Sequence, residues 1–395
     1  MKKRTTTCFL LLFLLLLPFN LVLGSPLTVE VSTKTQLVAA VKAANQRGGH
    51  TTILLNNGTY SLSGGLSLTA PFITLQGKSR DRTKVIIEGD AMSANASVGC
   101  LILVSADNCT LAHLTLQKCR WHLVQIRGEY DADGITIKNC ILRDSYEQMV
   151  KVSVDPDNTE IAGDNGLVEN CLFEYSAGIG PQWYIGGIDA HSAKNWVVRN
   201  NTFKSISSPA DRISEFAIHF WNHSANNLVE KNLIINCDRG IGFGLGERGN
   251  RGGIIRNNMI YHAAGYGTYA DTGIALETSP ESQVYNNTVF LEHSYPSAIE
   301  YRFSATRDIL IANNLTNKPI QVRNGANGTL LTNIVSAEKN WFKNVEQGDL
   351  HLISQNVTPV VKKGSFIPSL SDDFDGDFRS NSGRVNIGAD ETTDK

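Results

Sequence analysis

A short pattern of alternating aliphatic and variable residues recurs eight times in this 395-residue chain. The copies are LVQIR (123–127), VKVS (150–153), IDAH (188–191), IHFW (218–221), IGFG (241–244), IALE (274–277), IEYR (299–302) and IQVR (320–323). Side chains alternate between the two faces of a strand. The aliphatic positions therefore predict a buried core, and the variable positions predict one continuous outward surface.

Between these copies lie seven segments with a polar pair, mostly Asn-Asn or Asn-Cys, flanked by apolar residues. They are ITIKNCILRD (135–144), GLVENCLFEY (166–175), WVVRNNTFKS (196–205), NLVEKNLIIN (227–236), GIIRNNMIYH (253–262), SQVYNNTVFL (282–291) and ILIANNLTNK (309–318). A period of roughly 20–35 residues without intervening helices predicts an all-β, right-handed parallel β-helix. We expect the asparagines to stack as a hydrogen-bonded ladder inside it.

Cysteine placement fits the same scaffold. Beyond the N-terminal apolar run the chain has six cysteines: Cys100, Cys109, Cys119, Cys140, Cys171 and Cys237. Cys140 and Cys171 replace an asparagine of the repeat, which favours small buried fillers over disulfides, although a secreted protein permits disulfides.

The N-terminal residues predict export. A basic start precedes an apolar run that ends in small residues, so residues 1–24 are expected to be a secretory signal peptide. Its removal would take three of 36 basic residues and leave 33 against 38 acidic ones. We therefore expect a secreted or periplasmic monomer with no membrane span after signal removal, and no nucleic-acid partner, which would require a strongly basic surface.

The rest of the chain divides into two parts. Residues 25–50 are expected to form an N-terminal cap, because 34–46 has helical apolar spacing and glycines follow it. A helix there would cover the exposed edge of the first coil. Residues 51–391 are expected to form the parallel β-helix domain.

The outward positions of the eight copies carry the candidate site. The catalytic candidates are Lys151, His191, His219 and Arg302. The substrate-binding candidates are Asp189, Trp221, Arg239, Gly242, Gly244, Glu277, Glu300 and Arg323. The small residues Gly242, Gly244 and Ala275 predict a depression, with His191, His219 and Arg302 at its border and Trp221 as a stacking wall.

Four insertions in the chain are expected to wall this site, because loops on one side of a solenoid commonly do so. They cover residues 176–187, 205–216, 246–253 and 262–273.

These residue types suit an acidic polysaccharide as the partner. In β-elimination a base removes the proton next to a uronate carboxylate, a cation neutralises that carboxylate, and an acid protonates the leaving oxygen. A glycoside hydrolase using two carboxylates, a uronate epimerase and a non-catalytic binding or adhesive protein remain alternatives. We expect His219→Ala and Arg302→Ala to abolish turnover with a nearly unchanged melting temperature.

The helix before TILLNNGTY, the asparagine-rich coils and the closing DFDGDFRSNSGRVNIGADE (373–391) resemble secreted β-helix proteins of the pectate-lyase-like superfamily. More narrowly, the chain is similar to the branch with alginate lyases and chondroitinase-B-type lyases. This resemblance implies a lyase with a groove lysine and arginine, for which Lys151 and Arg302 are the counterparts. It also implies calcium on acidic residues, but the sequence shows no acidic cluster on adjacent coils, so we assign no metal ligands.

Overall fold

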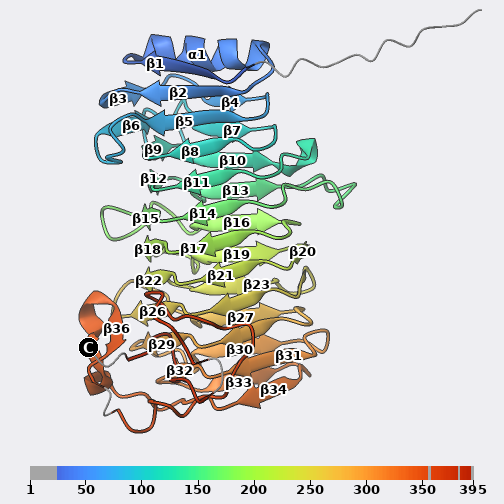
Figure 1. Ribbon diagram of the computed structural model, residues 1–395, viewed down its shortest axis with the longest axis vertical. Helices are drawn as coiled ribbons and strands as arrows, with labels where there is room; N and C mark the ends of the chain where they lie inside the picture. The colour runs from blue at the N-terminus through green and yellow to red at the C-terminus, as the bar shows by residue number, and fades with distance from the viewer. Residues whose placement is uncertain (1–24, 355–356, 381–382, 393–395) are drawn as a thin grey trace, which may run out of the picture.

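A single elongated solenoid accounts for most of the protein (Figure 1). The structure is a computed structural model, and it describes residues 25–354, 357–380 and 383–392. The predicted signal peptide, residues 1–24, lies outside the described residues. Within the described part, no helix combines the length and the apolar character needed to cross a membrane.

Three parallel sheets run the length of the solenoid. Sheet A consists of β1 (Leu27–Val31), β2 (Thr51–Leu55), β5 (Ile73–Gly77), β8 (Thr110–Ala112), β11 (Thr136–Lys138), β14 (Leu167–Glu169), β17 (Val197–Arg199), β21 (Leu228–Glu230), β25 (Ile254–Arg256), β28 (Gln283–Tyr285), β31 (Ile309–Ala312) and β34 (Gly328–Leu331). Sheet B consists of β3 (Gly58–Ser61), β6 (Val85–Glu88), β9 (Thr115–Cys119), β12 (Ile141–Ser145), β15 (Leu172–Glu174), β18 (Thr202–Lys204), β22 (Leu233–Ile235), β26 (Met259–His262), β29 (Thr288–Leu291) and β32 (Leu315–Thr316).

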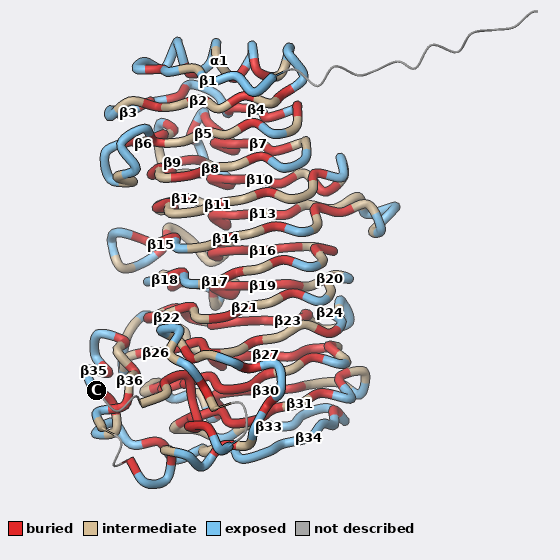
Figure 2. The backbone as a smooth tube through the Cα atoms, viewed as in Figure 1, coloured by how far each residue is buried: buried red, intermediate tan, exposed pale blue. Residues whose placement is uncertain are grey.

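Sheet C contains the eight predicted strands, preceded by two more. It consists of β4 (Leu66–Leu68), β7 (Ile102–Val104), β10 (Val124–Arg127), β13 (Val150–Ser153), β16 (Ile188–His191), β19 (Ile218–Trp221), β23 (Ile241–Phe243), β27 (Ile274–Glu277), β30 (Ile299–Arg302) and β33 (Ile320–Arg323). The strands pair in the predicted register, so that Val150 lies opposite Ile188 and Ile218 opposite Ile241. The aliphatic set faces the core, which Figure 2 shows as buried bands through the stack.

Each asparagine segment forms two strands, one in sheet A and one in sheet B, with its polar pair at the corner between them. The predicted ladder is present there. The side-chain oxygen of Asn232 accepts from the backbone and side-chain nitrogens of Asn201 at 3.1 and 3.0 Å, and Asn258 does the same for Asn232 at 3.0 Å each. The ladder continues through Asn287, Asn314 and Asn333. It therefore satisfies polar groups that the corner buries.

The cysteines are scaffold residues, as the repeat predicted. All six in the described part are free and buried. Cys171 stands in the ladder, where its backbone N–H donates to Asn201 Oδ1 at 2.9 Å and its sulfur accepts from the backbone N–H of Cys140 at 3.4 Å.

One α-helix, α1 (Lys34–Gln46), lies at the N-terminal end of the solenoid beside β1 (Figure 1). Thr33 precedes it, and the Thr33 side chain accepts from the backbone N–H of Gln36 at 3.2 Å. Leu37, Val41 and Ala44 form its buried face. The helix matches the predicted range 34–46, and its role as a protective cap stays a prediction.

At the other end, the parallel strands stop at Leu331, whereas we expected the β-helix to run to residue 391. The chain beyond forms an antiparallel hairpin, β35 (Phe342–Asn344) with β36 (Asp349–Leu352), and then packs back against the last coils (Figure 1). Arg379 anchors this return: its guanidinium is fully buried and donates to Gly388 O at 2.9 Å and Glu391 Oε2 at 2.8 Å. The remaining short elements of the described residues are the paired strands β20 (Ser224–Ala225) and β24 (Asn250–Arg251) and the 3-10 turns η1 (Gly128–Tyr130), η2 (Lys339–Trp341) and η3 (Val345–Gln347).

Candidate functional site

A hollow of about 450 Å³ lies on the outward face of sheet C over β13, β16 and β19. Its lining residues come from these strands, the loops at their ends and the loop that follows β23 (Ile241–Phe243): Lys151, Ser153, Val154, Pro156, Tyr184, Asp189, His191, Glu215, Trp221, Asn222 and Arg248. Four residues that the sequence singled out, Lys151, Asp189, His191 and Trp221, therefore share one hollow, as strand parity predicted.

Asp189 is the centre of this group. Its carboxylate accepts a hydrogen bond from the Lys151 ammonium on one oxygen and from the Trp221 indole N–H, at 2.7 Å, on the other. The Asp189 side chain is only 4% exposed and the Lys151 side chain 12% exposed. Asp189 thus fixes the positions of a cation and an aromatic ring together.

The charges of the pair are mutually stabilised. Burial by itself would raise the pKa of Asp189, but the neighbouring Lys151 charge overcomes this and holds it well below its usual range. Burial likewise opposes the charged lysine, yet the Asp189 charge raises the pKa of Lys151. Both groups are therefore ionised at neutral pH, and Lys151 is a cation and not a resting base.

His191 is the neutral group of the hollow. Burial, followed by the charge of Lys151, lowers the pKa of His191 to about 4. Its Nε2 lies 3.0 Å from Lys151 Nζ, which donates to it because an ammonium can only donate. The proton of the neutral ring then sits on Nδ1, which lies 3.2 Å from Asn222 Nδ2. An amide nitrogen can only donate, so the Asn222 carboxamide must turn its oxygen toward His191 to accept this proton.

His219 differs from the expectation. It lies on the outward face, paired with Asp189 and Gly242, but its side chain is fully buried. The Phe216 ring lies 4.8 Å away, and Trp221 stacks parallel to the imidazole at 5.2 Å. The loop that carries Phe216 folds over this face, so His219 cannot contact a substrate directly.

The predicted depression over Gly242, Gly244 and Ala275 is filled for the same reason. A Cβ on Gly242 would lie 2.8 Å from the Phe216 ring, so the glycine makes room for that ring and not for a sugar. Gly244 has φ +77°, and a Cβ there would lie 1.8 Å from Glu277 O. The glycine is therefore required by its backbone conformation and by the close approach of the Glu277 backbone. Ala275 is buried. The open space lies instead beside these positions, over β13, β16 and the end of β19.

Burial also determines the protonation state of His219. Desolvation lowers the pKa of His219 to about 4. Its Nε2 donates to Gly244 O at 3.3 Å, while Nδ1 lies 3.7 Å from Asp189 Oδ1 and has no hydrogen-bond partner among the described residues. The neutral His219 ring therefore packs against Trp221 from the buried side but donates no hydrogen bond to Asp189.

The remaining predicted residues form separate groups. Arg302 pairs with Glu277 at 3.0 Å. Arg302 is on β30, five strand positions from Lys151 on β13, which is about 24 Å at a spacing of about 4.8 Å. The two cannot contact the same sugar unit, so the expected pairing of Lys151 with Arg302 is not supported.

Three more predicted binding residues lie in ion pairs: Glu300 and Arg323 on the distal strands β30 and β33, and Arg239 in the turn before β23. Arg323 pairs with Glu300 at 3.0 Å, and Glu300 also accepts from the Tyr295 and Ser297 hydroxyls. Arg239 pairs with Asp271 at 3.4 Å. The Arg323–Glu300 contacts indicate a structural role, whereas Arg239 Nε is buried without a hydrogen-bond partner in the described part of the chain.

Three of the lining residues that were not predicted as site residues come from insertions: Tyr184, Glu215 and Arg248. Each belongs to an insertion expected to wall the site, namely 176–187, 205–216 and 246–253. The insertions were a usable signal, but which side chain in each loop turns inward depends on loop conformation. Arg248 is exposed, and its guanidinium lies 5.4 Å from the Trp221 ring centre.

Glu215 has an environment opposite to that of Asp189. Burial first, and then the negative charge of Asp189, raise the pKa of Glu215. Its carboxylate lies 4.0 Å from His219 Nδ1. The hollow therefore holds one carboxylate kept ionised and a second one that binds a proton more readily.

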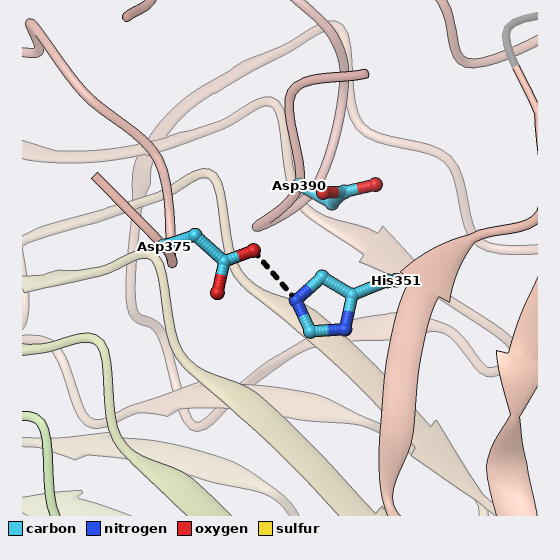
Figure 3. A group of neighbouring side chains, drawn as sticks. All are labelled: His351, Asp375 and Asp390. Atoms are coloured by element: carbon cyan, nitrogen blue, oxygen red, sulfur yellow. Dashed lines mark hydrogen bonds and ion pairs between the residues drawn. The ribbon is translucent and has the colours of Figure 1, made fainter. Parts of the chain in front are cut away.

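A different cluster lies in the C-terminal segment (Figure 3). His351, Asp375 and Asp390 have potential ligand atoms within 4.8 Å of one another. His351 Nε2 lies 2.9 Å from Asp375 Oδ2, and Asp390 Oδ2 accepts from the backbone N–H of Leu352 at 2.9 Å. These contacts already occupy the groups, so we interpret the cluster as an anchor for the hairpin and assign no metal to it.

Residues 126–333 match the family described as the right handed beta helix region, and the chain belongs to this family. No curated protein matches the sequence. A PL6 family alginate lyase, AlyGC, is similar in structure at 12% identity and TM-score 0.40, covering 84% of this chain and 56% of its own. The chain thus spans about half the length of that lyase.

Two further solved structures illustrate how varied the similar proteins are. A mannuronic acid specific polysaccharide family 6 lyase from human gut microbiota has 13% identity and TM-score 0.35, covering 82% of this chain and 90% of its own. PfbA, a surface adhesin of Streptococcus pneumoniae, has 12% identity and TM-score 0.39, covering 76% and 87%. At these identities the likeness concerns the fold alone.

Proposed function

We propose that this protein is a secreted, monomeric enzyme that cleaves a uronate-containing polysaccharide by β-elimination. The observation that carries the proposal is the contact between Lys151 and His191 in an open hollow: a fixed cation lies 3.0 Å from a neutral imidazole. Elimination next to a carboxylate needs this combination, because the cation stabilises the charge that develops as the base removes the proton.

Lys151 has three N–H donors, of which two are directed at Asp189 and His191. The third is free for the substrate carboxylate, and Arg248 at the rim can bind the same group. When a carboxylate draws the Lys151 ammonium toward itself, the Nε2 lone pair of His191 is released to accept the proton from the carbon next to the carboxylate. The carbon–oxygen bond then breaks as the new double bond forms.

The leaving oxygen needs a proton, and Glu215 is our candidate donor. Burial and the Asp189 charge raise the pKa of Glu215, which favours the protonated form that an acid catalyst requires. Asp189 and Trp221 act as positioning residues, and His219 packs against Trp221 from the buried side.

The test is to incubate the protein with alginate, pectate and chondroitin and follow the ultraviolet absorbance of unsaturated uronate ends. We expect absorbance to rise with one of these polymers and to be lost in Lys151→Ala and His191→Ala. Lys204→Ala, an exposed lysine on sheet B, is the matched control. Wild-type protein that produces no unsaturated ends with any uronate polymer would refute the lyase proposal.

One observation favours a second candidate, a glycoside hydrolase. The pKa of Asp189 is lowered and that of Glu215 is raised. In glycoside hydrolases a pair of carboxyl groups with different pKa values supplies one ionised carboxylate and one protonated acid. Against this, both oxygens of Asp189 are already occupied by Lys151 and Trp221. New reducing ends without unsaturation would support the hydrolase, and polymer binding without cleavage would support a carbohydrate-binding protein.

A further inference from the structure

Two exposed aromatic side chains lie at opposite ends of β10. This strand is next to β13 on the N-terminal side of the hollow. Trp121 is 41% exposed and Tyr130 is 57% exposed. Trp121 lies three residues before the first residue of β10. Glu215, in the wall of the hollow, lies at the same distance before the first residue of β19. Tyr130 follows β10 on the side where Ser153 and Pro156 line the hollow. The two rings thus continue the two walls by one coil.

Each ring has an arginine lying over it. The Arg120 guanidinium is 4.3 Å from the centre of the Trp121 ring, and the Arg127 guanidinium is 4.0 Å from that of Tyr130. A Cβ on Gly99 would lie 2.7 Å from the Trp121 ring, so only a glycine lets the indole lie in this position.

The contacts of these residues reach the hollow. Arg127 Nε donates to Glu129 at 3.0 Å, and Glu129 in turn accepts from Ser153 Oγ, which lines the hollow, at 2.6 Å. On the other side, burial raises the pKa of Glu147, while the charges of Lys151 and Arg120 both oppose that rise. Glu147 thus lies within electrostatic reach of the catalytic lysine and of Arg120.

We propose that Trp121 with Arg120 and Tyr130 with Arg127 form an additional binding subsite for a uronate unit of the same polysaccharide chain, on the N-terminal side of the cleavage site. This inference rests on the proposed function. The strand spacing of about 4.8 Å is close to the length of one sugar unit, so a chain running along the solenoid axis would place its next unit over β10.

The chemistry of the pairs selects an acidic sugar. An aromatic ring offers an apolar face to a sugar ring, and this alone would suit a neutral glycan. An arginine held against the same ring adds planar donors that match a carboxylate. Two such pairs, one before and one after the same strand, favour a unit with an apolar face and a carboxylate edge.

The experiment measures binding of trimers and octamers of mannuronate and of galacturonate by calorimetry, in a His191→Gln background if the wild type cleaves them. Neutral cello-oligomers are the comparison ligands. We expect Trp121→Ala and Tyr130→Ala each to weaken binding of the preferred octamer roughly five- to ten-fold, with little effect on the trimer. Arg120→Gln should weaken binding of the uronate octamer and remove its preference over the neutral oligomer.

Phe366→Ala, an exposed aromatic in the C-terminal segment, is the matched control and should leave binding unchanged. Tyr130 is more exposed than Trp121, so Tyr130→Ala tests the subsite even if Trp121→Ala misfolds. The inference is overturned if Tyr130→Ala and a folded Trp121→Ala both bind the octamer with unchanged affinity. It is also overturned if the wild type binds none of the oligomers. Octamer binding that depends on Tyr130 without formation of unsaturated ends supports the subsite and refutes only the lyase proposal.

Discussion

The indole N–H of Trp221 donates a 2.7 Å hydrogen bond to Asp189 Oδ1, the carboxylate that also holds Lys151 in place. Trp221 is therefore more than a stacking surface. It belongs to the network that keeps Asp189 ionised and oriented, and this network couples the aromatic wall of the hollow to its cation.

Trp221→Phe keeps a ring at this position but removes the donor. We expect the free energy of unfolding to fall by about 1–2 kcal/mol, because a buried carboxylate oxygen loses its partner. Urea denaturation measures the change, with Trp183→Phe as the control for loss of an indole from a partly exposed site. An unchanged unfolding free energy in Trp221→Phe would contradict the proposed role of this bond.

His219→Ala should unfold more easily than the wild type. This reverses the expectation of an unchanged melting temperature, because the structure buries the imidazole completely between Phe216 and Trp221. The cavity left behind should cost about 2–4 kcal/mol. His191→Ala, at the partly exposed neighbouring position, should cost clearly less; equal losses in denaturant titrations would argue against this difference in burial.

Gly242→Ala tests whether Phe216 fills the predicted depression. The new methyl group would lie 2.8 Å from the Phe216 ring, so the loop must move or the strand must shift. We expect a loss of about 1–3 kcal/mol in stability, as for other overpacked sites, and reduced activity because Glu215 moves with the loop. The double variant Gly242→Ala with Phe216→Ala should recover part of the stability lost in Gly242→Ala alone, and no recovery would contradict the contact.

Stability should fall with acid in a defined range. The pKa values of His191 and His219 are lowered to about 4 by burial, from a usual 6.5. The unfolded chain therefore binds protons below about pH 6.5 while the folded protein does not, so the stability contributed by each neutral histidine is present above that pH. It is progressively lost as the pH falls toward 4.

Unfolding titrations at several pH values measure this effect, and His219→Gln should show a shallower pH dependence between 6.5 and 4. If His191 is the base, activity should persist below pH 6 while the protein remains folded. An acid limb of activity near pH 6.5 would contradict that assignment.

Asn232→Ala should disrupt the ladder at its middle. Its amide donates to Val198 O and to Asn258 Oδ1 and accepts from Asn201, and all of these groups are buried. We expect a loss of about 3 kcal/mol or more in unfolding free energy, since several buried polar groups lose partners. Gln347→Ala, an exposed amide, is the control and should change stability by less than about 0.5 kcal/mol.

The fold could be predicted because the β-helix is built from local alternation repeated along the chain. The pairing of Val150 with Ile188 and of Ile218 with Ile241 follows once each coil adds one strand to each sheet. A slip by one residue would turn every aliphatic side chain outward, so the pattern leaves one register. The same argument placed Lys151, Asp189, His191 and Trp221 on one face. The recurring polar pair separately predicted the asparagine ladder and buried positions for Cys140 and Cys171.

The shape of the site was decided only by the tertiary structure. Strand parity gives the direction of a side chain but not what covers it, and the Phe216 loop buries His219 and fills the space over Gly242. Parity also treats all coils alike, whereas the stacking distance separates Arg302 from Lys151 by five strand positions. The sequence thus determined the scaffold and its outward face, while loop conformation, which depends on long-range packing, selected Tyr184, Glu215 and Arg248 as the walls of the hollow.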